Sequence, residues 1–473
     1  MSPPRFIQGL VQAVATLGCI VLIASCGGAG EVGSGGTGAA LGTVTGFGSI
    51  IVDGVRFDDS NATVQVENVP DQQDPGEAKL GQRVEIDFET EGVARTVRIE
   101  PEVVGSVSAT SGTGLTLLGQ SVVINTDILN GPVTQFANGY ASLADVKVSE
   151  VVEVHGVARL QGAGYVIQAT RIEKRSALPA YLRVAGIVSG LTGPASGQHF
   201  TLGGLGVDTA GAFVVPASRG LADGQPVVVW ARAANLKTSG AGAPSLTANL
   251  VRIREQASSS QRAYLGGVVS GRTGTSFSLG GVAVNYANAL VTPAGSVVGN
   301  GQYVQVRGDF AADGSLVASS VKIRDGRFEP DAELRGTVSG FDAPTKSFKV
   351  RDITVVATTA ILDSSCPAGG LADGLFVEIK GRLSLTGIVA LNIKCDSDEP
   401  AGAIVERRGV ASKPGARTFT LTPTAGPPLE VRWTALTYFR DVTPDALDGK
   451  ALRVDGILAA TNTLIATKIR LDD

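Results

Sequence analysis

The chain has 473 residues, too many for one ordinary domain, and its 62 glycines are roughly twice the average share. Abundant Gly, Val, Thr and Ser without long helical periodicity predict an all-β protein of short strands and tight turns. The 40 Lys and Arg nearly balance the 44 Asp and Glu, and no basic cluster marks a nucleic-acid face. We therefore expect no nucleic-acid partner.

The first 25 residues have the features of an export signal. Arg5 precedes an apolar stretch from Leu10 to Ala24, shorter than the ~20 residues that a spanning helix needs. The stretch ends in Ile23-Ala24-Ser25-Cys26, which resembles the bacterial lipobox. The resemblance implies cleavage before Cys26 and attachment of lipid to its thiol, hence a membrane partner through a firm anchor. The alternative is an ordinary signal peptide in which Cys26 is accidental.

The residues after the lipobox suggest a location and a tether. Gly27 stands where an inner-membrane retention signal has Asp, so we expect an outer-membrane lipoprotein of the cell envelope. Residues 26–41 are Gly-rich and predict a flexible tether. Gly33 to Gly38 formally match a dinucleotide fingerprint, but no strand precedes them and no helix follows. We expect no cofactor.

The rest of the chain repeats one pattern six times. The phrase G-x-V-S/T-G, or a looser version of it, opens every copy, and the openings lie roughly 60 to 80 residues apart, the size of a small domain; they begin at Gly42, Gly105, Gly186, Gly267, Gly336 and Gly409. The predicted repeats span residues 42–101, 102–178, 179–258, 259–330, 331–400 and 401–473. We expect each copy to have its own core and to fold alone.

Within a copy, five apolar/polar alternations predict five strands with one wet face. The fourth strand reads V-x-V-x-G, as in Val304 to Gly308, and the fifth closes on Ala and Ile, as in Ala318 and Ile323. Five strands with a longer connector between the third and fourth follow the order of the five-stranded OB barrel. Small independent sandwiches are the alternative, but five short strands make a poor double sheet.

The repeat resembles a bacterial family of exported β-domains of unknown function, number 5666 in its series. The opening phrase, the fourth strand and the closing Ala and Ile carry the resemblance, together with Gly46-Phe47-Gly48-Ser49-Ile50 and Val52-Asp53-Gly54-Val55. It covers nearly all of the chain after Leu41. The family implies a β-domain fold and supplies no catalytic residues.

Few residues are candidates for catalysis or metal binding. His155 occupies a polar slot of a fourth strand and His199 precedes a second strand, so we expect a surface side chain and a turn residue. No Ser or Cys nucleophile shares a motif with either His. Cys366 and Cys395 predict a disulfide in an oxidising periplasm, because a zinc site needs more ligands at closer spacing. We expect no metal site and no enzyme.

One acidic segment is a candidate calcium site, and three tyrosines help to distinguish the classes of function that remain. Asp58-Asp59-Ser60-Asn61 is either a hairpin turn or half of a calcium site. A binding or scaffold protein of the envelope, for an envelope protein or a polysaccharide, is the preferred function, and clustering of Tyr165, Tyr181 and Tyr264 would support it. A passive structural lipoprotein is the first alternative. A hydrolase is the second, and two facing carboxylates with raised pKa in one pocket would favour it.

Overall fold

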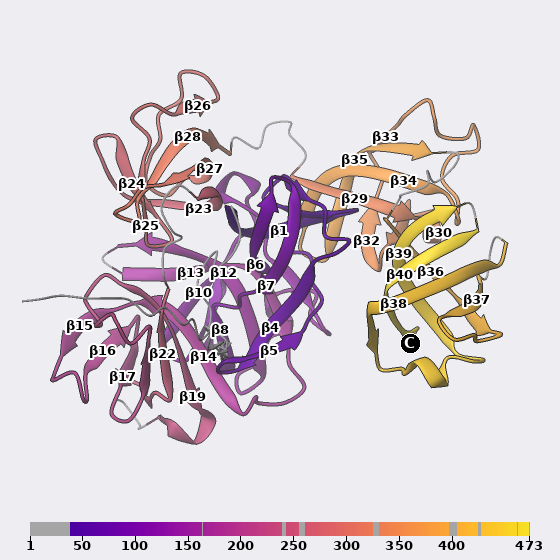
Figure 1. The fold of residues 1–473 in the computed structure, drawn as a ribbon. Coiled ribbons are helices and arrows are strands. Elements are labelled where there is room, and N and C mark those ends of the chain that lie inside the picture. The colour runs from indigo at the N-terminus through magenta and orange to yellow at the C-terminus, as the bar shows by residue number, and fades with distance from the viewer. Residues whose placement is uncertain are drawn as a thin grey trace, which may run out of the picture.

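The computed structural model describes residues 38–162, 164–238, 243–254, 261–324, 331–396, 404–423, 427–460 and 462–472. Over these residues the chain is all β, with four short 3-10 helices, and its strands form six small OB-like barrels in chain order (Figure 1). The predicted fold class is confirmed. Among the described residues, no helix has the length and apolar character that crossing a membrane requires.

The first three barrels occupy the N-terminal half. Barrel 1 comprises β1 (Gly38–Phe47), β2 (Ile50–Val52), β3 (Val55–Phe57), β4 (Thr63–Val69), β5 (Gln72–Pro75), β6 (Arg83–Thr90) and β7 (Val93–Ile99). Barrel 2 comprises β8 (Val103–Thr110), β9 (Gly114–Leu117), β10 (Gln120–Ile124), η1 (Ile128–Asn130), β11 (Gln135–Ala137), η2 (Leu143–Asp145), β12 (Val151–Gln161) and β13 (Gly164–Lys174). Barrel 3 comprises β14 (Tyr181–Ile187), β15 (Ser189–Thr192), β16 (His199–Leu202), β17 (Leu205–Asp208), β18 (Phe213–Val215), β19 (Pro226–Arg232), η3 (Ala233–Asn235), β20 (Leu236–Lys237), β21 (Ser245–Thr247) and β22 (Leu250–Ile253).

The other three barrels follow. Barrel 4 comprises β23 (Arg262–Thr273), β24 (Ser276–Leu279), β25 (Val282–Asn285), β26 (Leu290–Thr292), β27 (Tyr303–Phe310) and β28 (Leu316–Ile323). Barrel 5 comprises β29 (Ala332–Thr337), β30 (Ser339–Asp342), β31 (Ser347–Val350), β32 (Ile353–Val356), β33 (Ile361–Leu362), β34 (Phe376–Ser384) and β35 (Gly387–Asp396). Barrel 6 comprises β36 (Ile404–Ser412), β37 (Thr418–Thr422), β38 (Leu429–Arg440), η4 (Pro444–Ala446), β39 (Ala451–Ala460) and β40 (Thr463–Leu471).

Each barrel closes by the same circuit. In barrel 2 the first strand, β8, pairs antiparallel with the second, β9, and with the fourth, β12. The third, β10, pairs parallel with the fifth, β13, which also pairs antiparallel with β12. Alternation supplies the core: along β28 the side chains of Leu316, Ala318, Val321 and Ile323 are buried. Closure leaves few free sheet edges.

The glycine of the fourth-strand motif lies at a β-bulge. Pairing with the fifth strand shifts register at Gly156, Gly308, Gly381 and Gly456. A Cβ atom at any of these positions would overlap a backbone carbonyl of the fifth strand. Glycine is therefore required for the close approach that bends the strand around the barrel.

Barrel 1 contacts each of the other five barrels, and Figure 1 shows it in indigo at the centre of the assembly. Strand β1 pairs in parallel with β23 of barrel 4 and with β29 of barrel 5. Polar contacts reach every neighbour; they are Arg83 to His155 in barrel 2, Glu67 to Arg252 in barrel 3, Glu91 to Tyr264 in barrel 4, Arg56 to Glu333 in barrel 5 and Glu77 to Arg470 in barrel 6.

The two-residue turns between the second and third strands also join barrels. Asp53, in the turn of barrel 1, accepts a hydrogen bond of 2.8 Å from Tyr303 of barrel 4. The turns of barrels 2 and 3 meet where the Gly204 N–H donates to the Gly119 carbonyl at 2.9 Å. Asp352, in the turn of barrel 5, forms ion pairs with two arginines of barrel 6.

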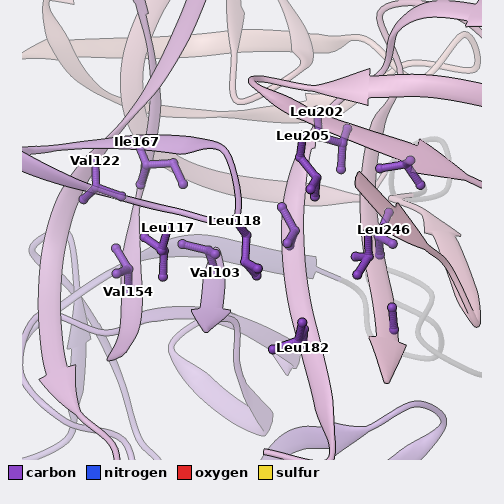
Figure 2. Packing of buried hydrophobic residues seen from close by; sticks show 14 of the residues in the cluster. Val103, Leu117, Leu118, Val122, Val154, Ile167, Leu182, Leu202, Leu205 and Leu246 are labelled. Carbon is purple, nitrogen blue, oxygen red and sulfur yellow. The ribbon is translucent and has the colours of Figure 1, made fainter. Parts of the chain in front are cut away.

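Barrels 2 and 3 share one hydrophobic core, so the expectation that each copy has its own core is wrong for this pair. Figure 2 shows Leu118 between Val103 and Leu117 of barrel 2 and Leu182, Leu202 and Leu205 of barrel 3, all in one cluster. Strands β8 and β14 also pair antiparallel across the junction. The tether expectation is wrong for residues 38–41, because they begin β1; residues 26–37 lie outside the described residues.

Candidate functional site

The structure places some of the predicted residues. Cys26 lies outside the described residues. Cys366, in the connector after β33, and Cys395, on β35, form a disulfide with Cα atoms 4.7 Å apart. Asp58 and Asp59 form a turn in which they accept the N–H groups of Ser60 and Ile50. In the described part of the chain, no group of three or more His, Cys, Asp or Glu is placed to hold a metal.

The surface position predicted for His155 is wrong. Its side chain is fully buried between barrels 2 and 1. Nδ1 accepts the backbone N–H of Arg83 at 3.3 Å, and Nε2 lies 2.9 Å from Glu153 Oε1. Burial opposes ionisation of Glu153, but His155 and Arg175 outweigh it and lower the pKa of that carboxyl. The polar face of β12 meets matched polar groups of barrel 1 instead of water.

His199 lies elsewhere than predicted, and the three tyrosines do not cluster. His199 begins β16 instead of lying in a turn, with an exposed side chain 3.7 Å from Asp208. Tyr264 packs against phenylalanines of barrel 1, Tyr181 stacks with an arginine of its own barrel, and Tyr165 is exposed. The three tyrosines thus lie in three different environments. They do not form the aromatic cluster that would have supported a binding function.

A cavity of about 450 Å³ opens where barrels 1, 2, 5 and 6 meet. We call it the junction cavity. It is lined by four cationic and four acidic side chains, by amides and hydroxyls, and by a few apolar groups; the charged ones are Lys79, Arg171, Arg351, Arg470, Glu77, Asp352, Glu406 and Asp455. Its volume is in the range of small-molecule binding sites.

Two carboxylates of barrel 6 face each other in this cavity. Glu406 on β36 and Asp455 on β39 are direct register partners. Burial, and then the charge of Asp455, raise the pKa of Glu406 to about 7. Burial also raises the pKa of Asp455. Arg470 lies between them, with its guanidinium 3.1 Å from Glu406 and 3.8 Å from Asp455.

A third carboxylate, Glu77, reaches the cavity from the loop after β5 of barrel 1. Lys468 and Arg470 of barrel 6 contact it at 2.9 and 2.6 Å, and Arg440 at 3.1 Å. Burial opposes its ionisation, yet these three cations together lower the pKa of Glu77. Barrel 6 is therefore held to barrel 1 by an ionised carboxylate at the rim of the junction cavity.

The turn of barrel 5 that lines the cavity carries backbone strain. Arg351 and Asp352 have φ of 51° and 63°, a left-handed conformation that non-glycine residues adopt at a cost of order 1–3 kcal/mol each. The corresponding turns of barrels 1 to 4 each contain at least one Gly, as in Gly280-Gly281. Sequence reasoning missed this site, and the departure from glycine at this turn is the signal that could have revealed it.

Comparisons with known proteins bear on the fold. A family model described as a domain of unknown function (DUF5666) matches residues 104–173, 266–322, 335–394 and 410–470, more than half of the chain. The chain belongs to this family. The matched segments are barrels 2, 4, 5 and 6, the four with glycine at the bulge. A comparison with curated proteins finds no match.

Solved structures add only weak likenesses. The chain is similar to a Drosophila structure described as Unr CSD456, with 14% identity over 46% of this chain and 99% of that one, at a TM-score of 0.13. It is also similar to a multidomain protein with nucleic acid binding domains from Streptococcus pneumoniae, with 12% identity over 45% of this chain and 73% of that one, at a TM-score of 0.12. At these TM-scores neither likeness carries an argument about function.

Proposed function

We propose that this protein is a lipid-anchored cell-envelope protein that acts by binding, and that the junction cavity binds a neutral segment of an envelope polysaccharide. The observation that carries the proposal is the cavity itself, which four separate barrels build together. The protein would then bind through one composite site and not through six independent weak ones, because barrel 1 fixes the other barrels in place.

The lining favours a neutral, hydroxyl-rich ligand. Its charges balance, so a strongly charged polymer gains no net attraction from them. Carboxylates, guanidinium groups and amides such as Gln135 and Asn138 offer both acceptors and donors for hydroxyls. Phe47, Phe136 and Ile353 add apolar surface for the faces of sugar rings. A passive structural role would not need such a cavity.

The test blocks the cavity at an exposed position. Thr386 lies in the turn between β34 and β35 and lines the cavity, so Thr386→Trp should fill it without disturbing a core. Ala312 occupies the corresponding exposed turn of barrel 4, which makes Ala312→Trp the matched control. Calorimetry with neutral oligosaccharides released from bacterial envelopes should show binding that Thr386→Trp weakens about tenfold or more, equivalent to 1.4 kcal/mol. Binding that is absent, or equal in both variants, would contradict the proposal.

A hydrolase is the second candidate, favoured by the raised pKa values of Glu406 and Asp455. A protonated Glu406 would serve as general acid and the second carboxylate as base or nucleophile, the pairing found in glycosidases. Against it, Arg408 and Arg470 already engage Oε1 and Oε2 of Glu406, and ion networks of this kind also shift pKa values. Release of reducing ends from the bound oligosaccharide, abolished by Glu406→Gln, would establish the hydrolase.

The anchor is tested separately. Labelled palmitate should be incorporated into the wild-type chain and not into Cys26→Ser, because the lipobox resemblance assigns the lipid to that thiol. Equal labelling of both would show that the anchor assignment is wrong. It would leave the cavity proposal standing.

A further inference from the structure

A second cavity, of about 150 Å³, lies where barrels 1, 2, 3 and 4 meet. We call it the central cavity. It is separate from the junction cavity and is built by different residues. An apolar cavity of similar volume in an engineered protein admits benzene, so the central cavity has room for one small ring.

Much of its wall is apolar. Barrel 3 contributes Ile187 and Val228, and barrel 4 contributes Leu279, Val282 and Phe310. The glycines of the β24–β25 turn also line it, so the barrel 4 side presents little polar surface. A ligand must therefore have an apolar body on this side.

Barrel 3 also lines the cavity with Trp230 on β19. Its side chain is 1% exposed, and the guanidinium groups of Arg183 and Arg252 lie 5.3 and 4.8 Å from the ring centroid. Arg183 is its register partner on β14, and Arg252 extends from β22, the strand on the other side of β19. The outer face of barrel 3 thus presents an indole between two cations to the cavity.

Several N–H groups at this place have no acceptor among the described residues. Trp230 Nε1 and Arg252 Nε, both on side chains that line the cavity, are buried without a hydrogen bond, and so are Nε and Nη1 of the adjacent Arg183. The outer nitrogens of Arg252 are already taken: Nη2 donates to Glu67 at 2.9 Å and to Asp71 at 2.7 Å, and Nη1 donates to Glu67. The unmet side-chain atoms here are all donors, and a buried donor without an acceptor costs free energy.

We infer that the central cavity binds a small neutral molecule that has an apolar body and an oxygen acceptor, such as a cyclic ketone. The acceptor meets the unpartnered donors beside Trp230, and the ring packs on the barrel 4 wall. A carboxylate ligand is disfavoured because Glu67, Glu100 and Glu102 already line the cavity and neutralise its arginines. This site goes beyond the polysaccharide proposal and shares no lining residue with it.

The experiment reads the indole N–H directly. The chain has two tryptophans, so the indole region of a ¹⁵N–¹H spectrum of the full mature protein contains two resonances. Trp433→Phe assigns them, because Trp433 packs between Phe419 and Phe439 in barrel 6 and an aromatic replacement preserves that packing. The three probes are cyclohexanone, methylcyclohexane and cyclohexanecarboxylate, which share a ring and differ in the acceptor and the charge.

Cyclohexanone should saturate and move the Trp230 Nε1–H resonance downfield, as a new hydrogen bond does. Methylcyclohexane and cyclohexanecarboxylate should give smaller shifts. Val282→Phe should fill the cavity and weaken cyclohexanone binding about tenfold or more, whereas Val317→Phe, on an exposed position of the same barrel, should not. The inference is overturned if cyclohexanone leaves the resonance unmoved, so that the cavity holds water alone, or if the other probes act as strongly.

Discussion

Replacing Glu406 by Gln should be more favourable for the stability of the protein at pH 8 than at pH 5, each measured relative to the wild type. The side chain of Glu406 is 9% exposed, and burial together with the charge of Asp455 raises the pKa of its carboxyl from 4.5 to about 7. A carboxyl whose pKa is raised on folding binds a proton in the folded state that the unfolded chain has released. Its contribution to stability is therefore present below pH 4.5 and is lost as the pH rises through about 7.

The magnitude follows from the two pKa values. One pKa unit corresponds to roughly 1.4 kcal/mol, so the full range is about 3 kcal/mol, and the part between pH 5 and pH 8 is roughly 2 to 3 kcal/mol. Gln has no proton to lose in this range. The difference in unfolding free energy between Glu406→Gln and the wild type should thus become more favourable by this amount at the higher pH.

Urea unfolding of the two proteins at both pH values measures this difference, since urea leaves the charges of the site unscreened. Glu430→Gln is the matched control: Glu430 belongs to the same barrel and is exposed, paired with Arg432 on the surface. The control should follow the wild type at each pH. If Glu406→Gln changes stability equally at pH 5 and pH 8, the carboxyl is ionised throughout and the account of its environment is wrong.

Three further changes test the packing. Leu118→Ala should cost roughly 2–5 kcal/mol and destabilise barrels 2 and 3 together, which hydrogen exchange in both barrels checks; loss confined to barrel 2 would refute the shared core. Gly266→Ala places a Cβ against the buried Asp53 carboxylate and should loosen barrel 4 from barrel 1 in limited proteolysis, whereas Gly112→Ala, in open space, should not. Opening the Cys366–Cys395 disulfide should cost roughly 3 kcal/mol in a thermal melt, and two free thiols in non-reducing mass spectrometry of periplasmic material would contradict its presence.

The sequence predicted the structure of a single barrel well, because that information is local. Alternation of period two decides which residues point inward, and it identified the strands that close each barrel. The glycine of V-x-V-x-G marks a bulge where only a residue without a Cβ fits, as Gly308 shows. The four barrels that have this glycine are also the four that the family model matches.

The packing of barrels on one another could not be predicted from these patterns. Strand β6 alternates as Arg83, Val84, Glu85, Ile86 and Asp87, yet all five residues are buried. Alternation tells which face of a strand is apolar, but it does not tell whether the polar face meets water or the matched charges of another barrel. The surface position that alternation predicts for His155 is wrong for this reason.

What the sequence by itself determined is the all-β class, the number of barrels and the order of strands in each, since these depend on neighbours one, two or a few residues apart. The tertiary structure alone decided that barrel 1 is the centre, that barrels 2 and 3 share a core, and that two cavities form at four-barrel junctions. These features bring together side chains from distant repeats, such as Glu77 with Arg470 and Glu67 with Arg252. Charge complementarity between residues so far apart in the sequence produces no periodic pattern in a single chain. A strand face that meets another barrel carries the same kinds of polar residues as one that meets water.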